Sequence, residues 1–92
     1  MAKRTDHNQA KIVSALRDAG ATVRILSTVG GGVPDLLVGW QGSNYLLEVK
    51  NLDGRGDRMT KAELKFWEAW TGQAAVVHNA QEALAALRSG VG

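Results

Sequence analysis

Two short apolar runs in the middle of the chain, residues 33–40 and 45–50, flank the polar segment 41–44. Apolar runs of this length, bounded by turn residues, are typical of β-strands joined in a hairpin. We expect Gly42 and Ser43 to form a two-residue type II′ turn, because its first position requires a positive φ that glycine adopts at no steric cost. The hairpin constrains the fold more than any other feature, because its pairing decides which side chains share a face.

Three charged residues interrupt these apolar runs: Asp35 in the first, and Glu48 and Lys50 in the second. Burial of an unpaired charge is costly, so we expect these residues to partner one another. With the expected turn, Asp35 lies opposite Lys50, and Glu48 shares their face because side chains alternate along a strand. The sequence thus predicts one patch that holds two carboxylates and an ammonium.

Such a patch suits metal-assisted hydrolysis of a phosphodiester bond. The Cβ atoms of facing or diagonal residues lie about 5 to 8 Å apart, so Asp35 and Glu48 can reach one cation. A hard divalent cation takes oxygen ligands and binds substrate phosphate, and the Val49 carbonyl is a third candidate ligand. The cation lowers the pKa of a bound water, while Lys50 can orient that water or neutralise a phosphate oxygen. The alternative is an Asp35–Lys50 ion pair without chemistry, which leaves Glu48 unexplained.

The remaining sequence predicts helices and strands in an α/β arrangement. An amphipathic stripe indicates a first helix that has Asp6 as its N-cap, ends near Gly20 and faces inward with Gln9, Ile12, Val13 and Leu16. Further segments are a strand over 21–26, a glycine loop over 27–32, a loop over 51–59, a helix over 60–71, a strand over 73–78 and a helix over 79–87. The order helix-strand-strand-strand-helix-strand-helix predicts a single mixed β-sheet flanked by helices.

Length and composition indicate a single domain over residues 1–92, because 92 residues leave too little buried surface for a second core. The chain has no cysteine, which excludes disulfide scaffolds and thiolate metal sites. Eleven basic and nine acidic residues give a net charge of +2, which is compatible with a nucleic-acid partner. No apolar run approaches the roughly 20 residues that span a bilayer, so we expect no membrane segment and a cytoplasmic location.

The pair Pro34-Asp35, followed a hairpin later by Glu48-Val49-Lys50, resembles the signature of the PD-(D/E)XK nuclease superfamily. The surrounding string GGGVPDLLVGWQGSNYLLEVKN, with a capped helix soon after it, looks like the small VRR-NUC branch. The resemblance covers nearly the whole chain and implies a restriction-endonuclease-like core. It also implies that Asp35 and Glu48 bind Mg²⁺ or Mn²⁺ and that Lys50 is the catalytic lysine.

Two residues outside the hairpin are weaker candidates for the same site. Many superfamily members contribute an acidic residue from the first helix, whereas this chain has Gln9 at the matching turn. Its amide is a candidate metal ligand, directly or through water, or it completes a capping box with Asp6. Glu63 follows Thr60 by three residues, so it either caps the second helix alone or also faces the site.

Basic and aromatic residues surround the second helix. Four basic side chains are candidates to bind DNA phosphates or are simply solvated: Arg55, Arg58, Lys61 and Lys65. The helical cluster of Phe66, Trp67 and Trp70 is more typical of a core or a subunit interface than of base stacking. This cluster exceeds what so small a core is expected to bury, which favours a homodimer.

The resemblance implies a metal-dependent DNA endonuclease that acts on branched or otherwise structured DNA. Stand-alone domains of this type resemble homodimeric Holliday-junction resolvases of bacteria and phages, with roles in recombination and DNA repair. Two alternatives stay open. One is a catalytically inactive DNA-binding module of a replication or repair complex, and the other is a nuclease that acts on flap or single-stranded substrates or on RNA.

Overall fold

The computed structural model describes residues 4–51 and 58–89 of the chain. Its elements are α1 (Arg4–Asp18), β1 (Thr22–Ile25), β2 (Leu36–Trp40), β3 (Ser43–Val49), α2 (Lys61–Ala69), β4 (Ala74–Val77) and α3 (Ala80–Ser89). This is the order that the sequence predicts. Within the described ranges, no helix combines the length and the apolar character needed to cross a membrane.

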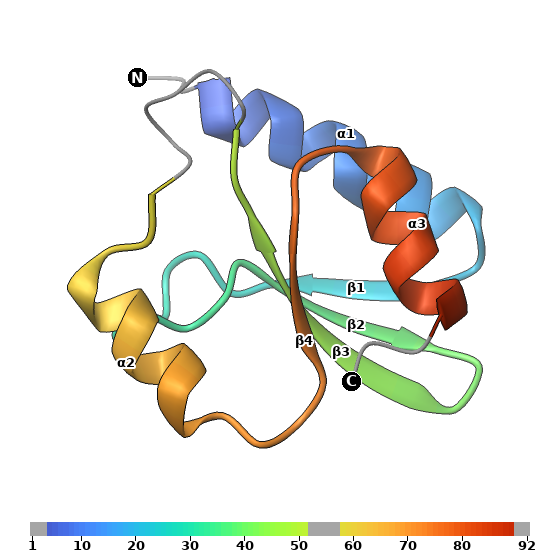
Figure 1. Ribbon diagram of the computed structural model, residues 1–92. Coiled ribbons are helices and arrows are strands. Elements are labelled where there is room, and N and C mark those ends of the chain that lie inside the picture. Colours follow the sequence, from blue (N-terminus) through green and yellow to red (C-terminus); the bar gives the residue numbers. More distant parts are fainter. Residues whose placement is uncertain (1–3, 52–57, 90–92) are drawn as a thin grey trace.

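The strands form one sheet in the order β1-β2-β3-β4 (Figure 1). β1 and β2 pair antiparallel, as do β2 and β3, whereas β3 and β4 pair parallel. A parallel pair requires a crossover connection, because the chain must return to the end of the sheet from which it started. The segment that contains α2 makes this crossover. The expected mixed α/β sheet is therefore confirmed.

The hydrophobic core lies between one face of the sheet and helices α1 and α3. These two helices contact each other, as Figure 1 shows, and each contributes the apolar stripe of an amphipathic helix. The strands contribute every second residue, because side chains alternate between the two faces. The buried core residues with the least exposure are Ile12, Leu16, Val23, Leu36, Val38, Leu47, Val77 and Ala83.

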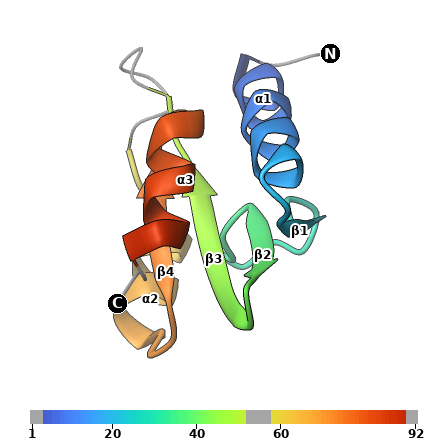
Figure 2. The same ribbon diagram turned by 90° about the vertical axis from the view of Figure 1, so that its right-hand side faces the viewer.

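The opposite face of the sheet is only partly covered. Leu37 and Val76 are exposed on it, and Leu46 and Glu48 are buried between them. Helix α2 lies apart from α1 in both views (Figures 1 and 2), and none of its own residues is buried. The charged residues of the hairpin therefore lie on this second face, beside α2.

The hairpin turn differs from the one expected. Trp40 pairs with Ser43, so the two turn residues are Gln41 and Gly42, with φ of 49° and 83°. Two positive φ values define a type I′ turn, and the prediction of a type II′ turn at Gly42-Ser43 is wrong. The two registers differ by an even number of residues, so they bury the same faces and the hydrophobic pattern alone does not distinguish them.

One consequence of this register concerns the charged patch. One step beyond the Leu36–Leu47 pair, Asp35 lies across from Glu48 and not from Lys50. The expected Asp35–Lys50 pairing is therefore wrong. The three residues still share a face, because a two-residue change of register preserves the alternation of side chains.

The start of α1 also differs from the prediction. Asp6 has helical backbone within Arg4–Asp18, whereas an N-cap residue has a non-helical conformation. The predicted N-cap at Asp6 is wrong, and so is the capping box between Asp6 and Gln9. The other two caps are confirmed: Thr60 and Glu63 form a capping box on α2, and the Asn79 side chain accepts a hydrogen bond from the Glu82 amide at the start of α3.

The turn geometry predicts different effects on stability for two glycine-to-alanine substitutions. Gly42→Ala should lower the free energy of unfolding by roughly 1 to 2 kcal/mol, because alanine is strained at positive φ. No atom lies within 4 Å of a Cβ placed at Gly42, so this cost is purely conformational. The control Gly39→Ala lies within β2 and meets only an ordinary contact with Asn44. It should leave stability unchanged or raise it slightly. Urea unfolding measures both, and equal stability of the two variants would contradict the type I′ turn.

Candidate active site

Glu48 and Lys50 are the buried charged residues of the described chain, at 3% and 8% exposure. Glu48 lies near the end of β3 and Lys50 directly follows that strand. Asp35 is half-buried and directly precedes β2. The neighbouring ends of two paired strands thus bring together the three residues that the sequence selects.

Asp35 is held by hydrogen bonds at both its backbone and its side chain. Its carbonyl accepts from the Leu26 amide at 2.7 Å, and its Oδ2 accepts from the Val49 amide at 2.9 Å. The preceding Pro34 is fully buried, which adds a rigid φ next to the carboxylate. Burial raises the pKa of Asp35, and the Val49 hydrogen bond and the Lys50 charge only partly oppose that rise.

The Lys50 ammonium donates to three oxygens. Its Nζ lies 2.8 Å from Glu63 Oε1, 3.1 Å from the Arg58 carbonyl and 3.3 Å from Glu48 Oε2. These partners use all three donors of a lysine. Burial alone would lower the pKa of Lys50, but the hydrogen bond with Glu63 and the charges of Glu48 and Glu63 raise it above its usual value. Lys50 is therefore a fixed cation.

Glu63 joins helix α2 to this cation. Its Oε1 accepts from the Thr60 amide at 2.9 Å, its own amide donates to Thr60 Oγ1 at 3.1 Å, and the same Oε1 accepts from Lys50. Both interpretations of Glu63 thus hold together, since it caps α2 and faces the site. Burial raises its pKa, but the hydrogen bonds from Lys50 and Thr60 outweigh that effect and lower it.

Glu48 is the least satisfied group of the site. Burial, and next the charge of Asp35, raise its pKa to about 8. Within the described residues, Glu48 Oε1 is buried without a hydrogen-bond partner. A divalent cation would neutralise the repulsion between Asp35 and Glu48 and give this oxygen a ligand bond, so the carboxylate pair fits a metal. Among the described residues, no group of three or more His, Cys, Asp or Glu side chains is placed so that it could hold a metal.

Gln9 reaches the site through Ser27. The Ser27 hydroxyl donates to Gln9 Oε1 at 3.4 Å, and the nearness of the same hydroxyl is the smallest of the effects on the pKa of Asp35, which it lowers. Its single proton serves one of these two acceptors at a time. Ser27 therefore links α1 to the carboxylate pair. Sequence reasoning missed this serine, and its only signal is its position directly after the strand over 21–26.

A second polar contact from α1 supports the chain after Lys50. Asn8 Nδ2 donates to Asn51 Oδ1 at 3.0 Å and to the His78 carbonyl at 3.1 Å. This contact ties the residue after Lys50 to α1 and to the residue after β4. Sequence reasoning also missed Asn8, because a single polar residue near a helix start carries no signal for it.

The basic candidates lie on and before α2. Arg58, Lys61 and Lys65 are exposed, and the Arg58 backbone also accepts from Lys50. Arg55 lies outside the described residues. Three described cations therefore face solvent on the segment that approaches Glu63.

The glycine loop packs against the first turn of α2. Gly32 has a φ of 82°, and a Cβ there would overlap the Ala62 carbonyl and approach the Glu63 amide. Gly31 has a similar φ of 67°, but a Cβ at that residue would have no atom within 4 Å. Gly32 is thus the position where close backbone approach requires glycine. This approach places α2, and with it Glu63, beside Lys50.

Comparison with known proteins bears on the fold. No protein-family model matches the chain, and no curated protein matches it. A solved structure described as "VRR_NUC domain" is similar over 97% of this chain and 99% of that chain, with a TM-score of 0.66 and 24% sequence identity. The fold of this chain is therefore that of a VRR_NUC domain, as the resemblance in the sequence predicts.

The packing of Gly32 predicts a difference between two neighbouring substitutions. Gly31→Ala and Gly32→Ala both introduce alanine at positive φ and should each cost roughly 1 to 2 kcal/mol. Gly32→Ala should cost about 1 to 3 kcal/mol more, because its Cβ would displace the first turn of α2. Urea unfolding of both variants measures the difference. Equal losses would show that Gly32 does not hold α2 in place.

The raised pKa of Glu48 predicts a pH-dependent gain for Glu48→Gln in the metal-free protein. Asp35, Lys50 and Glu63 face this group, and its pKa is about 8 in the folded protein against 4.5 as an ordinary glutamate. The folded state therefore keeps a proton that the unfolded chain loses. The stability from this proton is complete below pH 4.5 and is lost as the pH rises through 8.

Thermal melting with a chelator, from about pH 5 to about pH 9, tests this linkage. The wild-type melting temperature should fall relative to that of Glu48→Gln, and a difference of 1 kcal/mol corresponds to about 4 to 8 °C in a domain of this size. Glu68→Gln changes an exposed glutamate of α2 and is the matched control. A difference between Glu48→Gln and wild type that does not change with pH would refute the raised pKa.

Proposed function

We propose that this protein is a divalent-metal-dependent endonuclease that hydrolyses phosphodiester bonds of DNA. The observation that carries the proposal is the pair of the half-buried Asp35 and the buried Glu48 beside the fixed Lys50 ammonium, with one Glu48 oxygen that has no partner among the described residues. Paired carboxylates beside a lysine suit phosphate chemistry, because the carboxylates bind a metal cation and the lysine stabilises negative charge on the phosphate. The VRR_NUC-like fold supports the same activity.

Mg²⁺ or Mn²⁺ is the proposed cofactor, held by the carboxylates of Asp35 and Glu48 and by the Val49 carbonyl. Gln9 is the proposed neutral ligand from α1, acting through water, because its amide oxygen already accepts from Ser27 beside Asp35. When bound, the metal supplies Lewis acidity toward a phosphate oxygen and acidifies water. Asp35 is preorganised for this role by its Val49 hydrogen bond.

Lys50 is proposed to orient the attacking water or to neutralise a phosphate oxygen. Its raised pKa keeps it protonated, so it acts as a cation and a donor and not as a general base. All three donors are engaged, and the Glu48 contact at 3.3 Å is the longest. We infer that Lys50 exchanges this contact for the substrate, while Glu63 and the Arg58 carbonyl hold the ammonium in place.

DNA is proposed to approach along the segment before α2 and the exposed side of that helix. Arg58, Lys61 and Lys65 are exposed there and would contact phosphates, which positions a strand without reading its sequence. Arg55 is proposed to join them. The first turn of α2 also carries Glu63, so the same helix would hold both the DNA backbone and the Lys50 partner.

A homodimer acting on branched DNA is the proposed form of the enzyme. Four large apolar residues are exposed on α2 and the open face of the sheet or just after them: Leu37, Leu64, Trp70 and Val76. Trp70 stacks on Phe66 at 5.2 Å between ring centroids. A second copy would cover these residues, and a twofold pair of sites would cut two related strands of a junction. Light scattering of the purified protein tests the dimer.

Cleavage of labelled DNA tests the function. Four-way junction, flap, linear duplex and single-stranded DNA are incubated with wild type in Mg²⁺ and in Mn²⁺. Wild type should cut the branched substrates only with metal. Lys50→Met, which keeps the aliphatic stem, and Glu48→Gln should each lower the rate about a hundredfold or more. Arg88→Ala, on the exposed end of α3, is the control that should cut as wild type does.

Other outcomes would identify other functions. Binding of these substrates without cleavage in either metal would refute the nuclease and favour a DNA-binding module. Preferential cleavage of flap or single-stranded DNA would refute the junction preference but retain the chemistry. Melting curves of each variant separate loss of activity from loss of fold.

A further inference from the structure

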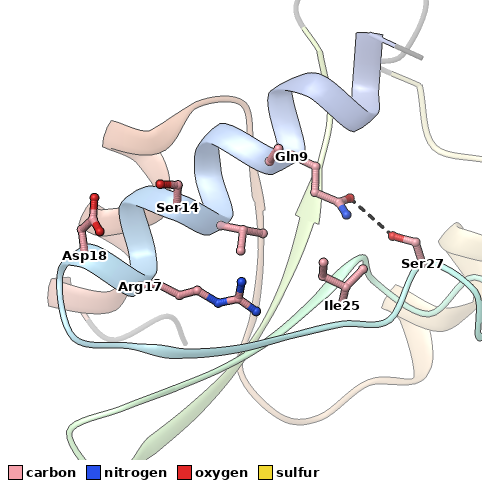
Figure 3. A pocket seen from close by; sticks show the side chains of 8 residues that line it. Gln9, Ser14, Arg17, Asp18, Ile25 and Ser27 are labelled. Atoms are coloured by element: carbon pink, nitrogen blue, oxygen red, sulfur yellow. Dashed lines mark hydrogen bonds between the residues drawn. The ribbon is translucent and has the colours of Figure 1, made fainter. Parts of the chain in front are cut away.

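A surface groove lies between α1 and the edge strand β1, next to the proposed active site (Figure 3). It encloses about 650 Å³, and Gln9, Val13, Arg17, Ile25 and Ser27 are among the residues that line it. Its volume falls in the range of sites that bind small organic groups, roughly 300 to 1,000 Å³. Gln9 and Ser27, at one end of the groove, already have roles in the proposed active site, whereas Arg17 and Ile25 have none so far.

Ser27 brings one end of the groove close to Asp35 of the carboxylate pair. Ser27 lines the groove and donates to Gln9 Oε1, and it directly follows Leu26, whose amide donates to the Asp35 carbonyl at 2.7 Å. Figure 3 shows the Gln9 side chain pointing from α1 to Ser27 at one end of the groove. A molecule that lies in the groove would therefore reach the proposed site at this end.

Arg17 supplies a positive charge farther along the same groove. It lies in the last turn of α1, two helical turns from Gln9 and about 12 Å along the helix axis. Its Nη2 donates to the Val23 carbonyl at 3.0 Å, which leaves further N–H groups of the guanidinium for another acceptor. Asp18 also lines the groove, but in Figure 3 its carboxylate points away from the Arg17 guanidinium. The charge of Arg17 is thus available to an anion in the groove.

Ile25 supplies an apolar surface between these two ends. Its side chain is 53% exposed although it belongs to β1 and follows the buried Val23 on the same face. An apolar side chain flanked by amide and hydroxyl groups on one side and a cation on the other matches a nucleotide, which has a flat base, a sugar and a phosphate. A paired duplex keeps its bases stacked inside and would not place one on Ile25.

We propose that this groove binds an unpaired nucleotide of the DNA strand next to the bond that is cut. The base lies on Ile25, and a neighbouring phosphate contacts Arg17. This inference rests on the proposed function, and it assigns to the substrate at least one nucleotide that is not base-paired. Junctions and other branched DNAs provide such nucleotides where their strands separate.

Binding measurements test the groove without requiring cleavage. Fluorescence anisotropy, with Ca²⁺ in place of Mg²⁺, compares a labelled duplex with the same duplex carrying one unpaired nucleotide. Wild type should bind the second DNA about tenfold more tightly, because only an unpaired base can contact Ile25. Ile25→Thr keeps a β-branched residue and should remove most of that preference. Equal affinity of wild type for the two DNAs would overturn the proposal.

The salt dependence of binding tests Arg17 separately. Arg17→Gln keeps a polar N–H donor at this position but removes the charge. It should reduce the slope of log affinity against log salt by about 0.7 to 0.9, the value for one phosphate contact. Arg88→Gln makes the same change in the last turn of α3 and should leave the slope unchanged. Equal slopes for the two variants would overturn the phosphate contact, provided that their melting temperatures match.

The two proposals fail in different ways. If wild type cuts DNA but shows neither the preference nor the Arg17 effect, the groove proposal fails and the nuclease proposal stands. If wild type shows both effects but cuts no DNA in Mg²⁺ or Mn²⁺, the nuclease proposal fails and the groove remains a nucleotide-binding site.

Discussion

The structure depends on how the buried ammonium of Lys50 is satisfied. A buried charge is tolerated only when oxygens surround it, and here they come from β3, from the backbone at Arg58 and from the first turn of α2. Helix α2 has no buried residue of its own. Its place beside the sheet therefore rests on this charge and on the close approach of Gly32, together with the partly buried Phe66 and Trp67. The same contacts that hold the helix also immobilise the lysine.

The charges around Lys50 are unevenly balanced. Glu63 lies closest to the ammonium, and its pKa is lowered, whereas burial raises the pKa values of Asp35 and Glu48. The lysine thus compensates the carboxylate on α2 more than the two on the sheet. This imbalance makes the sheet carboxylates suited to a divalent cation, which would also give a ligand bond to the Glu48 oxygen that has no partner in the described part of the chain.

Much of this arrangement could be predicted from residues 33–50 alone. The hairpin and the shared face of its three charged residues followed from apolar alternation. The turn was misassigned to Gly42-Ser43, and the predicted face still held because the error in register was even. The sequence left open whether Glu63 only caps α2 or also faces the site, because a capping box and an ion pair use the same side chain. Ser27 gave almost no signal, because its partners Gln9 and Asp35 come from distant parts of the chain.

The sequence by itself determined the order of the elements, the helix-facing side of each strand and the concentration of charge at the end of the central hairpin. These are local properties, set by side-chain alternation, helical spacing and the turn preferences of glycine. Only the tertiary structure decided that Glu63 meets Lys50, that Gly32 lies against Ala62 and that Gln9 reaches Asp35 through Ser27. Those contacts join segments from different parts of the chain, and they form only when the sheet and helices pack and the buried charges must find partners.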